Sequence, residues 1–397
     1  MKINRRIAIR VCLLVTLAVA LSGASSRLRA DTGTCGGTSI TLPFTDVPSG
    51  NIFFCSIAEA FICGLTNGTD ATHYNPSDNV TREQMAAFVT RTQDSALKRG
   101  SHRAALDQWA IPTSVPFTGR TVVGNSPENV KSDGEDLWVA NNGSDSVSQV
   151  HASNGKLLGT WTGAVKAAGV VIARGRVFVT GDANPGSIYM IDPAQPPGGV
   201  TTLVFPLQSF PFTIAYDGFF LWTANQSGSI SKVNPANSAV TNFMGFNQPT
   251  GIIYDGTNIW VTDQGDNVLK EIDKTTGAVL LTVNVGSSPI SPIFDGANIW
   301  VPNEGSNSVT VVKASTGVVL ATLTGNNLSQ PNQAAFDGER ILMTNTGNGG
   351  SVSLWKASDL SPLGFATSAA SAFGACSDGL NFWLTLGDGP PGHLVRF

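Results

Sequence analysis

The hydrophobic residues of this chain are gathered in short runs separated by turn-forming dipeptides. Between residues 250 and 286 the runs "TGIIYDG", "NIWVTD", "NVLKEID" and "AVLLTVNVG" follow one another, rich in Ile, Val, Trp and Thr. Runs of this length and composition, bounded by Asp-Gly, Gly-Asp and Thr-Gly, predict β-strands. Apolar residues occupy both faces of each run instead of alternating with polar ones. We therefore expect sheets that are covered on both sides.

This pattern of strands repeats about every 40 residues. Seven units align on an Asp-Gly dipeptide, which Arg-Gly replaces in the second unit; the first residues of the dipeptides are Asp133, Arg174, Asp217, Asp255, Asp295, Asp337 and Asp378. Four strands at this period are typical of a propeller blade, whereas parallel β-solenoids, the alternative, repeat at about half this length or less. The sequence therefore predicts an all-β fold, a seven-bladed β-propeller over residues 120–397.

The seventh unit is one strand short. It ends at Phe397 after three strands, while an additional strand-like segment precedes the first unit. The sequence of that segment, "TVVGNSP", matches "TVNVGSSP" at the end of the fourth unit. We therefore expect residues 120–125 to complete the last blade and close the ring, which would remove the exposed sheet edge of an open array.

A large apolar residue recurs in the second strand of every unit. The series is Trp138, Phe178, Trp222, Trp260, Trp300, Leu342 and Trp383. We interpret these side chains as core between blades, each contributing about 1.5–3 kcal/mol by burial. The alternative is a platform on which a carbohydrate stacks.

Residues 1–30 have the pattern of a signal peptide. A basic segment, "MKINRRIAIR", precedes the apolar "VCLLVTLAVALSGA", with cleavage expected after Ala24 or Ala30. The apolar core is shorter than the roughly 20 residues of a membrane anchor. Ser25 stands where a lipoprotein cleavage site requires Cys, which disfavours a lipid anchor. We therefore expect a secreted, extracytoplasmic protein without a transmembrane span after signal removal.

Removal of the leader makes the chain acidic. Residues 1–30 hold six of the 24 Lys and Arg and no acidic residue, so the mature chain has 18 basic residues against 28 Asp and Glu, a formal net charge of −10. An acidic surface without a basic cluster repels phosphate backbones, which argues against nucleic-acid binding.

Residues 31–97 differ in character from the repeat and predict a small helical module. Two helical patterns flank a loop rich in Gly, Asn and Asp, and the second begins with the capping box Thr81 and Gln84. Cys55 and Cys63 fall in the first helix about 12 Å apart, too far to pair with each other, so we expect Cys35 to pair with one of them. Residues 98–119 are interpreted as a linker, and Cys376 as a small buried residue.

Two resemblances to known families follow from these motifs. The segments "WVPNEGSNSVTVVKASTGVVLATLTG" and "LWVANNGSDSVSQVHASNGKLLGTWTG" resemble the YVTN-type β-propeller repeats. That resemblance covers all seven units and implies the fold, but no one activity.

Residues 44–97 resemble a single S-layer homology (SLH) motif. The matching residues are Phe44, Asp46, Val47, Pro48, Ile57, Ala58, Ala60, Gly64, Tyr74, Pro76, Thr81, Arg82, Glu83, Met85, Ala86 and Arg91. The resemblance implies binding of an anionic cell-wall polysaccharide, with Arg82 as the candidate contact. The alternative is a small helical cap without a ligand.

Polar residues recur in the predicted loops between the second and third strands. They are Asp145, Asp182, Asn225, Asp263, Asp266, Glu304, Asn345 and Asp388. Carboxylates and amides that converge on the propeller axis could hold a calcium ion, which prefers six to eight oxygen ligands. The alternative, which we favour, is that Asn and Asp are there to form tight turns.

The sequence does not mark out a catalytic set. The four histidines, His73, His102, His151 and His393, fall outside these loops, so a lyase of the streptogramin-linearising type lacks its general base. A gluconolactonase-like site needs carboxylates, amides and a metal, which the loops could supply. We therefore expect an exported, non-enzymatic binding or scaffold protein, with a protein or small ligand at the channel face. A metal-dependent propeller enzyme acting on a small ligand is the alternative.

Overall fold

The structure, a computed structural model, describes residues 32–35, 38–62, 66, 68–81, 85, 118–368 and 370–397. It divides the chain into two compact units, residues 1–99 and 100–397. The predicted signal peptide, Cys63, Arg82 and most of the second predicted helix lie outside the described residues. So does most of the predicted linker, whose last two residues begin a strand.

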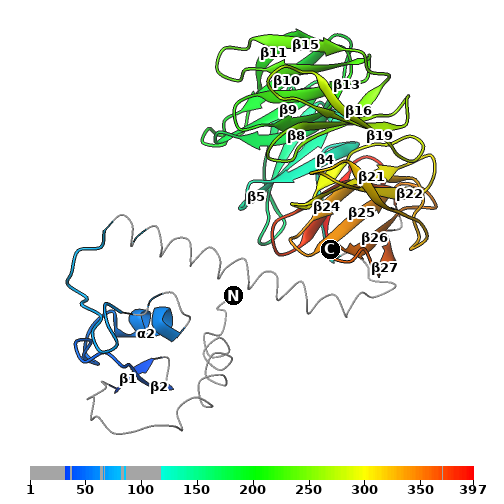
Figure 1. Ribbon diagram of the computed structural model, residues 1–397. Helices are drawn as coiled ribbons and strands as arrows, with labels where there is room; N and C mark the ends of the chain where they lie inside the picture. The colour runs from blue at the N-terminus through cyan, green and yellow to red at the C-terminus, as the bar shows by residue number, and fades with distance from the viewer. Residues whose placement is uncertain are drawn as a thin grey trace. The chain divides into compact units, whose positions relative to one another are not determined.

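Residues 118–397 form a seven-bladed β-propeller, as the repeat predicted (Figure 1). Each blade is a four-stranded antiparallel sheet. From blade 1 to blade 7 the innermost strands are β4 (Pro127–Ser132), β8 (Ala167–Ala173), β12 (Pro211–Tyr216), β16 (Pro249–Tyr254), β20 (Ile293–Phe294), β24 (Pro331–Phe336) and β28 (Ala372–Ser377). The second strands are β5 (Asp136–Asn141), β9 (Arg176–Gly181), β13 (Leu221–Asn225), β17 (Ile259–Asp263), β21 (Asn298–Asn303), β25 (Arg340–Asn345) and β29 (Phe382–Leu386).

The outer half of each blade completes the sheet. The third strands are β6 (Ser146–His151), β10 (Gly186–Ile191), β14 (Ser229–Val233), β18 (Val268–Ile272), β22 (Ser308–Lys313), β26 (Ser351–Lys356) and β30 (His393–Arg396). The outermost strands are β7 (Lys156–Thr162), β11 (Thr201–Leu207), β15 (Val240–Met244), β19 (Val279–Asn284), β23 (Val318–Leu323), β27 (Pro362–Thr367) and, in blade 7, β3 (Thr118–Val122). A short 3₁₀ helix, η1 (Asn142–Ser144), follows β5.

The ring is closed by the strand that precedes the first blade, which confirms the prediction. β3 pairs antiparallel with β30, with Thr121 opposite Leu394 and Val122 opposite His393. The backbone N–H of Val123 donates to the carbonyl of Gly392 at 3.0 Å. This strand begins at Thr118, two residues before the expected boundary. β4 also lies against β28, so the innermost strands form a continuous circle.

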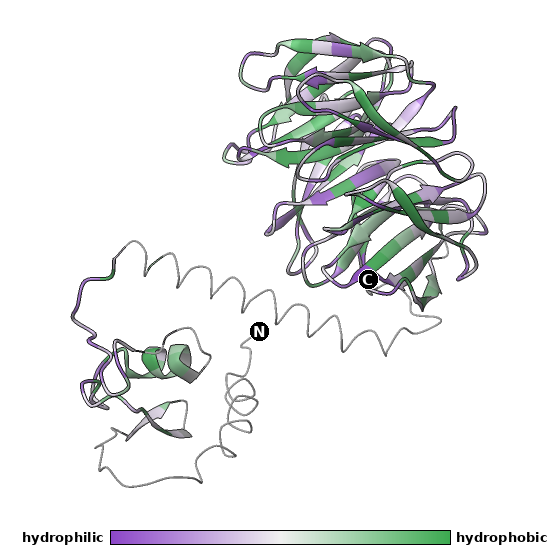
Figure 2. Ribbon diagram, viewed as in Figure 1, coloured by the Kyte–Doolittle hydropathy of each residue, from purple (hydrophilic) through white to green (hydrophobic). Residues whose placement is uncertain are grey.

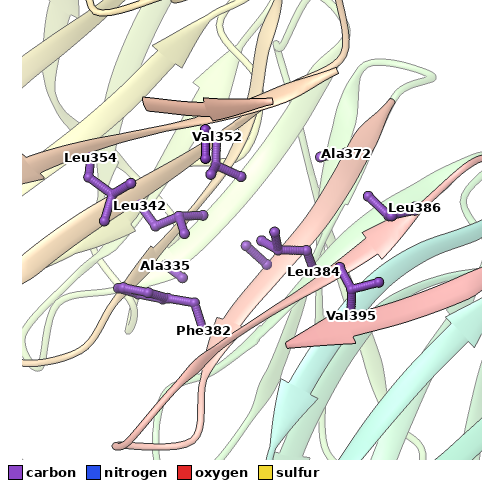
Figure 3. Close-up of a cluster of buried hydrophobic side chains, with 11 residues drawn as sticks. Ala335, Leu342, Val352, Leu354, Ala372, Phe382, Leu384, Leu386 and Val395 are labelled. Carbon is purple, nitrogen blue, oxygen red and sulfur yellow. The ribbon is translucent and has the colours of Figure 1, made fainter. Parts of the chain in front are cut away.

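Buried apolar residues of neighbouring blades form shared clusters, and Figure 2 shows that many strands of the propeller are hydrophobic. One such cluster joins blades 6 and 7, with Leu342 and Leu354 facing Phe382 and Leu384 (Figure 3). The second-strand series of Trp, Phe and Leu is buried in these interfaces. Because the Trp rings are covered by protein, the carbohydrate platform is excluded for them and the core interpretation is confirmed.

The Asp-Gly turns hold these tryptophans in place. Asp255 Oδ1 accepts the backbone N–H of Thr257 and Asn258, and Oδ2 accepts the indole N–H of Trp260 at 2.8 Å. Four other blades repeat the indole bond; the pairs are Trp138 with Asp133, Trp222 with Asp217, Trp300 with Asp295, and Trp383 with Asp378. A buried indole N–H requires an acceptor, and the turn aspartate five residues earlier supplies it.

The two blades without this Trp support the same explanation. In blade 2 Arg174 replaces the aspartate and Phe178, which has no N–H, replaces the Trp. In blade 6 Leu342 replaces the Trp, and the freed Oδ2 of Asp337 accepts Arg340 Nε at 2.8 Å. Donor and acceptor are therefore lost together in blade 2, and in blade 6 the retained acceptor takes another donor.

The described part of the N-terminal unit contains one helix and a small sheet. The helix α2 (Phe54–Ile62) was predicted, whereas the hairpin of β1 (Thr32–Cys35) and β2 (Thr38–Thr41) was not. Cys35 is joined to Cys55 by a disulfide, with the two Cα atoms 5.5 Å apart. This is one of the two pairings that the sequence left open. Among the described residues no helix has the length and apolar character needed to cross a membrane.

Candidate functional site

The loops that were expected to carry a site share one end of the ring. Each loop between the second and third strands bonds through its backbone to the segment that leads into the innermost strand of the same blade. Examples are Asp182 N to Lys166 O at 2.8 Å and Glu304 N to Ser288 O at 3.0 Å. We call this end the loop face, and the opposite end, with the Asp-Gly turns, the turn face.

Two of the eight predicted residues are asparagines buried inside their blades. Asn345, at the end of β25, donates from Nδ2 to Ser351 Oγ at 3.1 Å and Ser353 Oγ at 2.9 Å in β26. Asn225 makes the same two bonds, to Ser229 and Ser231. We call this arrangement the strand lock. It joins the second strand to the third, so these amides are structural and cannot reach a ligand.

The strand lock extends to residues that the loop analysis missed. Asn141 bonds Ser146 and Ser148, and Asn303 bonds Ser308 and Thr310, in the same geometry. The signal was present in the sequence: an Asn at the end of the second strand, followed by Ser-x-Ser or Ser-x-Thr at the start of the third. Because the bonds cross between strands, the role of this Asn becomes visible only once the strands are paired.

Blade 4 replaces the strand lock by an ion pair. Asp263 is buried and accepts Lys270 Nζ at 2.6 Å and the backbone N–H of Asn247 at 2.9 Å. Asp266 is exposed and accepts Asn247 Nδ2 at 2.9 Å, while Lys270 Nζ lies 3.5 Å away. Both predicted carboxylates are thus held by a neighbouring strand or loop.

Asp145 joins two blades. Its Oδ1 accepts the backbone N–H of Lys166, which leads into β8 of the next blade, at 2.8 Å. Asn267 and Asn307 do the same for Ser288 and Gln330. All three have positive φ values of 48–57°, a conformation that Asn and Asp tolerate better than most residues. The preference for turn formation therefore explains this position.

Two of the three remaining predicted residues, Asp388 and Glu304, have different surroundings. Asp388 accepts Arg120 at 3.0 Å and His393 at 2.7 Å, which ties the closing strand to blade 7. Glu304 is half-buried after β21, and its backbone bonds the preceding segment as described above.

Asp182 differs from the other predicted residues because its carboxylate is not satisfied. Its Oδ1 is buried without a hydrogen-bond partner among the described residues. Burial raises the pKa of Asp182, and Lys166 lowers it by a smaller amount. Burial also raises the pKa of Glu128, with a further increase from the charge of Asp182. Blades 1 and 2 therefore place two carboxylates with raised pKa values near each other at the loop face, and Glu128 was not predicted.

The calcium prediction has no support in the described residues. They contain no group of three or more His, Cys, Asp or Glu that could hold a metal ion. Asn225, Asp263 and Asn345 bond to residues of their own blades, as the favoured structural interpretation expects better than a shared ligand does.

The axis of the ring contains a cavity of about 80 Å³. Its wall is formed by the innermost strands of blades 1 to 6, and it includes Asn129, Lys131, Thr213, Ser291 and Gln333 among apolar residues such as Val170 and Ile252. Asn129, Thr213, Ser291 and Gln333 occupy the same position of the repeat in four blades, but the residue type differs in each. Lys131 has no charged counterpart at its position in the other blades.

The chain belongs by its architecture to the class of seven-bladed β-propellers, and comparison with known proteins adds no narrower class. No protein-family model and no curated protein matches it. Among solved structures it is similar to one titled "Streptogramin B lyase structure", with 16% identity, a TM-score of 0.57, and coverage of 72% of this chain and 100% of that chain. It is similar to a chain of a crystal structure of the mitotic checkpoint complex, with 15% identity, a TM-score of 0.61, and coverage of 72% and 96%. A computationally designed protein gives 13% identity, a TM-score of 0.53, and coverage of 68% and 82%. At these identities the likeness shows the fold alone.

Proposed function

We propose that this chain is an exported, non-enzymatic binding or scaffold protein, a YVTN-type propeller held at the cell envelope by an SLH-like module. One observation carries the proposal: the polar residues that recur in the loops are used to hold strands and blades together. Asn225 and Asn345 lock strands, Asp263 pairs with Lys270, and Asp145 joins two blades. Because these recurrent polar groups make bonds within the ring, we interpret the propeller as a rigid scaffold.

Export is supported by the leader pattern and by the disulfide. The pairing of Cys35 with Cys55 suits an oxidising compartment outside the cytoplasm, where such bonds persist. The prediction is that the mature chain is recovered from the culture medium or the envelope fraction. Recovery of the unprocessed chain in the cytoplasm would contradict it.

The SLH-like assignment is supported by the described part of the N-terminal unit. Phe44 is buried and packs against Phe61 and Tyr74 at ring-centroid distances of 5.0 and 5.4 Å. Asp46 accepts the backbone N–H of Tyr74 and Asn75, at 2.9 and 2.6 Å. Burial raises the pKa of Asp46, but these two bonds together lower it below the ordinary value. Residues that carry the resemblance therefore build a compact core and fix the loop.

Envelope binding is tested with the mature chain and purified cell-wall polysaccharide. We expect wild type to co-sediment with the polysaccharide. Arg82→Ala should bind at least about tenfold more weakly, because it loses one charge-assisted hydrogen bond. Arg176→Ala, which removes a propeller arginine paired with Asp192, is the matched control and should bind like wild type. Equal binding by all three proteins would overturn the assignment of Arg82, and no binding by wild type would overturn envelope attachment.

The alternative function is a metal-dependent propeller enzyme, lactonase- or lyase-like, acting on a small ligand. The observation in its favour is the pair of carboxylates, Glu128 and Asp182, at the loop face. Elemental analysis of the purified chain separates the two functions, because this alternative requires a stoichiometric divalent metal. Discovery of a metal-dependent hydrolase activity that Asp263→Ala or Glu304→Ala abolishes would overturn our proposal.

A further inference from the structure

The channel cavity has a polar wall that is built from particular blades. Lys131 and Asn129 come from blade 1, Ser291 from blade 5 and Gln333 from blade 6. The position of Lys131, which pairs with the second-strand Trp, is occupied in the other blades by Val171, Ala215, Ile253, Ile293, Ala335 and Cys376. A cation therefore replaces an apolar or thiol side chain once in the ring.

The four polar residues supply mainly hydrogen-bond donors. Gln333 Oε1 accepts the backbone N–H of Ala375 at 2.8 Å, which leaves the two Nε2 donors of this cavity-lining residue for a ligand. No described residue pairs with the Lys131 ammonium or the Asn129 Nδ2. An ammonium has three donors and an amide nitrogen two, and neither accepts. The cavity is thus rich in N–H groups and poor in acceptors.

Two of these residues keep an unsatisfied polar atom. Asn129 Oδ1 and Ser291 Oγ are buried without a hydrogen-bond partner among the described residues, and their side chains are 6% and 5% exposed. Leaving such a group unpaired costs about 1–3 kcal/mol. An acceptor in the cavity would account for Ser291 Oγ once its hydroxyl rotates toward it, whereas Asn129 Oδ1 is itself an acceptor and needs a donor such as an ordered water.

The charge of Lys131 decides the sign of that occupant. Burial lowers the pKa of Lys131, and the only titratable neighbour that opposes this within the described residues is the thiol of Cys376. Burial raises the pKa of that thiol to about 12, so it is neutral and cannot serve as a counter-ion. Glu128 lies three residues away along β4, but burial and Asp182 raise its pKa, opposite to the effect of a paired ammonium.

We propose that the channel binds a small carboxylate anion on Lys131, with hydrogen bonds from Asn129, Gln333 and Ser291. The carboxylate would accept from the ammonium and the two amides, and the serine hydroxyl would donate its proton to a second lone pair. A cavity of about 80 Å³ limits the group to the size of formate or acetate, or to the carboxylate end of a longer ligand. This inference rests on the proposed function as a binding protein and names its ligand class.

The test is calorimetric titration of the full mature chain with sodium formate, at constant ionic strength in a buffer whose anion is a large sulfonate. Formamide, a neutral molecule of the same shape, and bromide, a spherical anion, are the comparison ligands. We expect one formate per chain, no detectable binding of formamide, and weaker binding of bromide. Lys131→Met should weaken formate binding at least tenfold, while Lys356→Met, which removes a lysine of the turn face, should leave it unchanged.

Absence of formate binding to wild type would overturn the inference, because ordered water would then be the occupant. Unchanged binding by Lys131→Met would also overturn it, and bromide binding as tight as formate would overturn the carboxylate assignment. If Lys131→Met fails to fold by circular dichroism, Ser291→Ala replaces it, with an expected loss of three- to tenfold. Polysaccharide co-sedimentation does not involve these residues, so failure here leaves the envelope proposal standing.

Discussion

The loops and turns of the propeller repeat the same residues and hydrogen bonds from blade to blade, whereas the residues of its channel wall change. On the turn face, five blades carry the same bond from aspartate to indole, and on the loop face four blades carry the strand lock. At the channel wall one position carries a different polar residue in each of four blades, namely Asn129, Thr213, Ser291 and Gln333, while Lys131 is the one cation at its own position. The polar groups that recur with the same bonds are thus structural, and Lys131, which one blade alone carries, is available for a ligand.

The largest effect is expected from removal of the strand that closes the ring. Deletion of Thr118–Val122 leaves β30 as an unpaired edge and uncovers Leu394. Four ladder pairs at roughly 0.5–1.5 kcal/mol each predict a loss of about 4 kcal/mol, with aggregation through the new edge. Chemical denaturation and size-exclusion chromatography measure both. Deletion of residues 105–109, in the predicted linker, is the control and should change neither; equal behaviour of the two deletions would contradict closure by this strand.

The next effect is expected from a turn aspartate. Asp255→Ala removes the acceptor of two backbone N–H groups and of the buried Trp260 indole, so we expect unfolding free energy to fall by about 2–4 kcal/mol. In a Trp260→Phe background the loss should be smaller, because no indole N–H is left unpaired. A double-mutant cycle measures the coupling, and a coupling below about 0.5 kcal/mol would refute the role of the indole bond.

A strand-lock variant should lose less. Asn345→Ala leaves Ser351 and Ser353 without their shared donor, which we expect to cost about 1–3 kcal/mol. Asn284→Ala changes the same residue type at an exposed position of β19 and should be neutral. Urea unfolding of the two variants decides the matter, since equal midpoints would mean that the lock contributes nothing.

The smallest effect has the opposite sign. The pKa of Asp182 is raised in the folded protein, so its ionisation destabilises the fold as pH rises above the ordinary value of 3.8. Asp182→Asn should therefore be more stable than wild type at pH 7, by less than about 1 kcal/mol because solvent screens the partly exposed group. Melting temperatures between pH 3 and pH 8 should converge below pH 3.8. A lower melting temperature of the variant at pH 7 would show that the charged form is needed.

Most of the fold could be predicted from the sequence because its determinants are local. The Asp-Gly turns fixed the period, and the short last unit with the spare segment before Asp133 fixed the closure. The indole bond could also have been found, since aspartate and Trp are always five residues apart and change together at Arg174 and Phe178. The hairpin of β1 and β2 carried no such signal, being only four residues a strand.

The site was less predictable because Asn and Asp form turns and bind ligands with the same atoms. Asn345 and Asp182 look alike in the sequence, yet one is locked inside a blade and the other has an unsatisfied oxygen. Which side chain lines the channel also depends on an irregular step in register between Pro127 and Asn129 at the start of β4. Because such a step sets which way each later residue of the strand faces, Lys131 could not be assigned to the channel beforehand.

The division between structural and ligand-binding positions is tested most directly by the rise in melting temperature that formate causes in Lys131→Met and Asn345→Ala. A ligand that binds only the folded state raises the melting temperature by an amount that increases with the logarithm of its concentration relative to Kd. We predict that Asn345→Ala melts below wild type but keeps the full formate-induced rise, and that Lys131→Met loses that rise. An undiminished rise in Lys131→Met, or its loss in Asn345→Ala, would contradict the account.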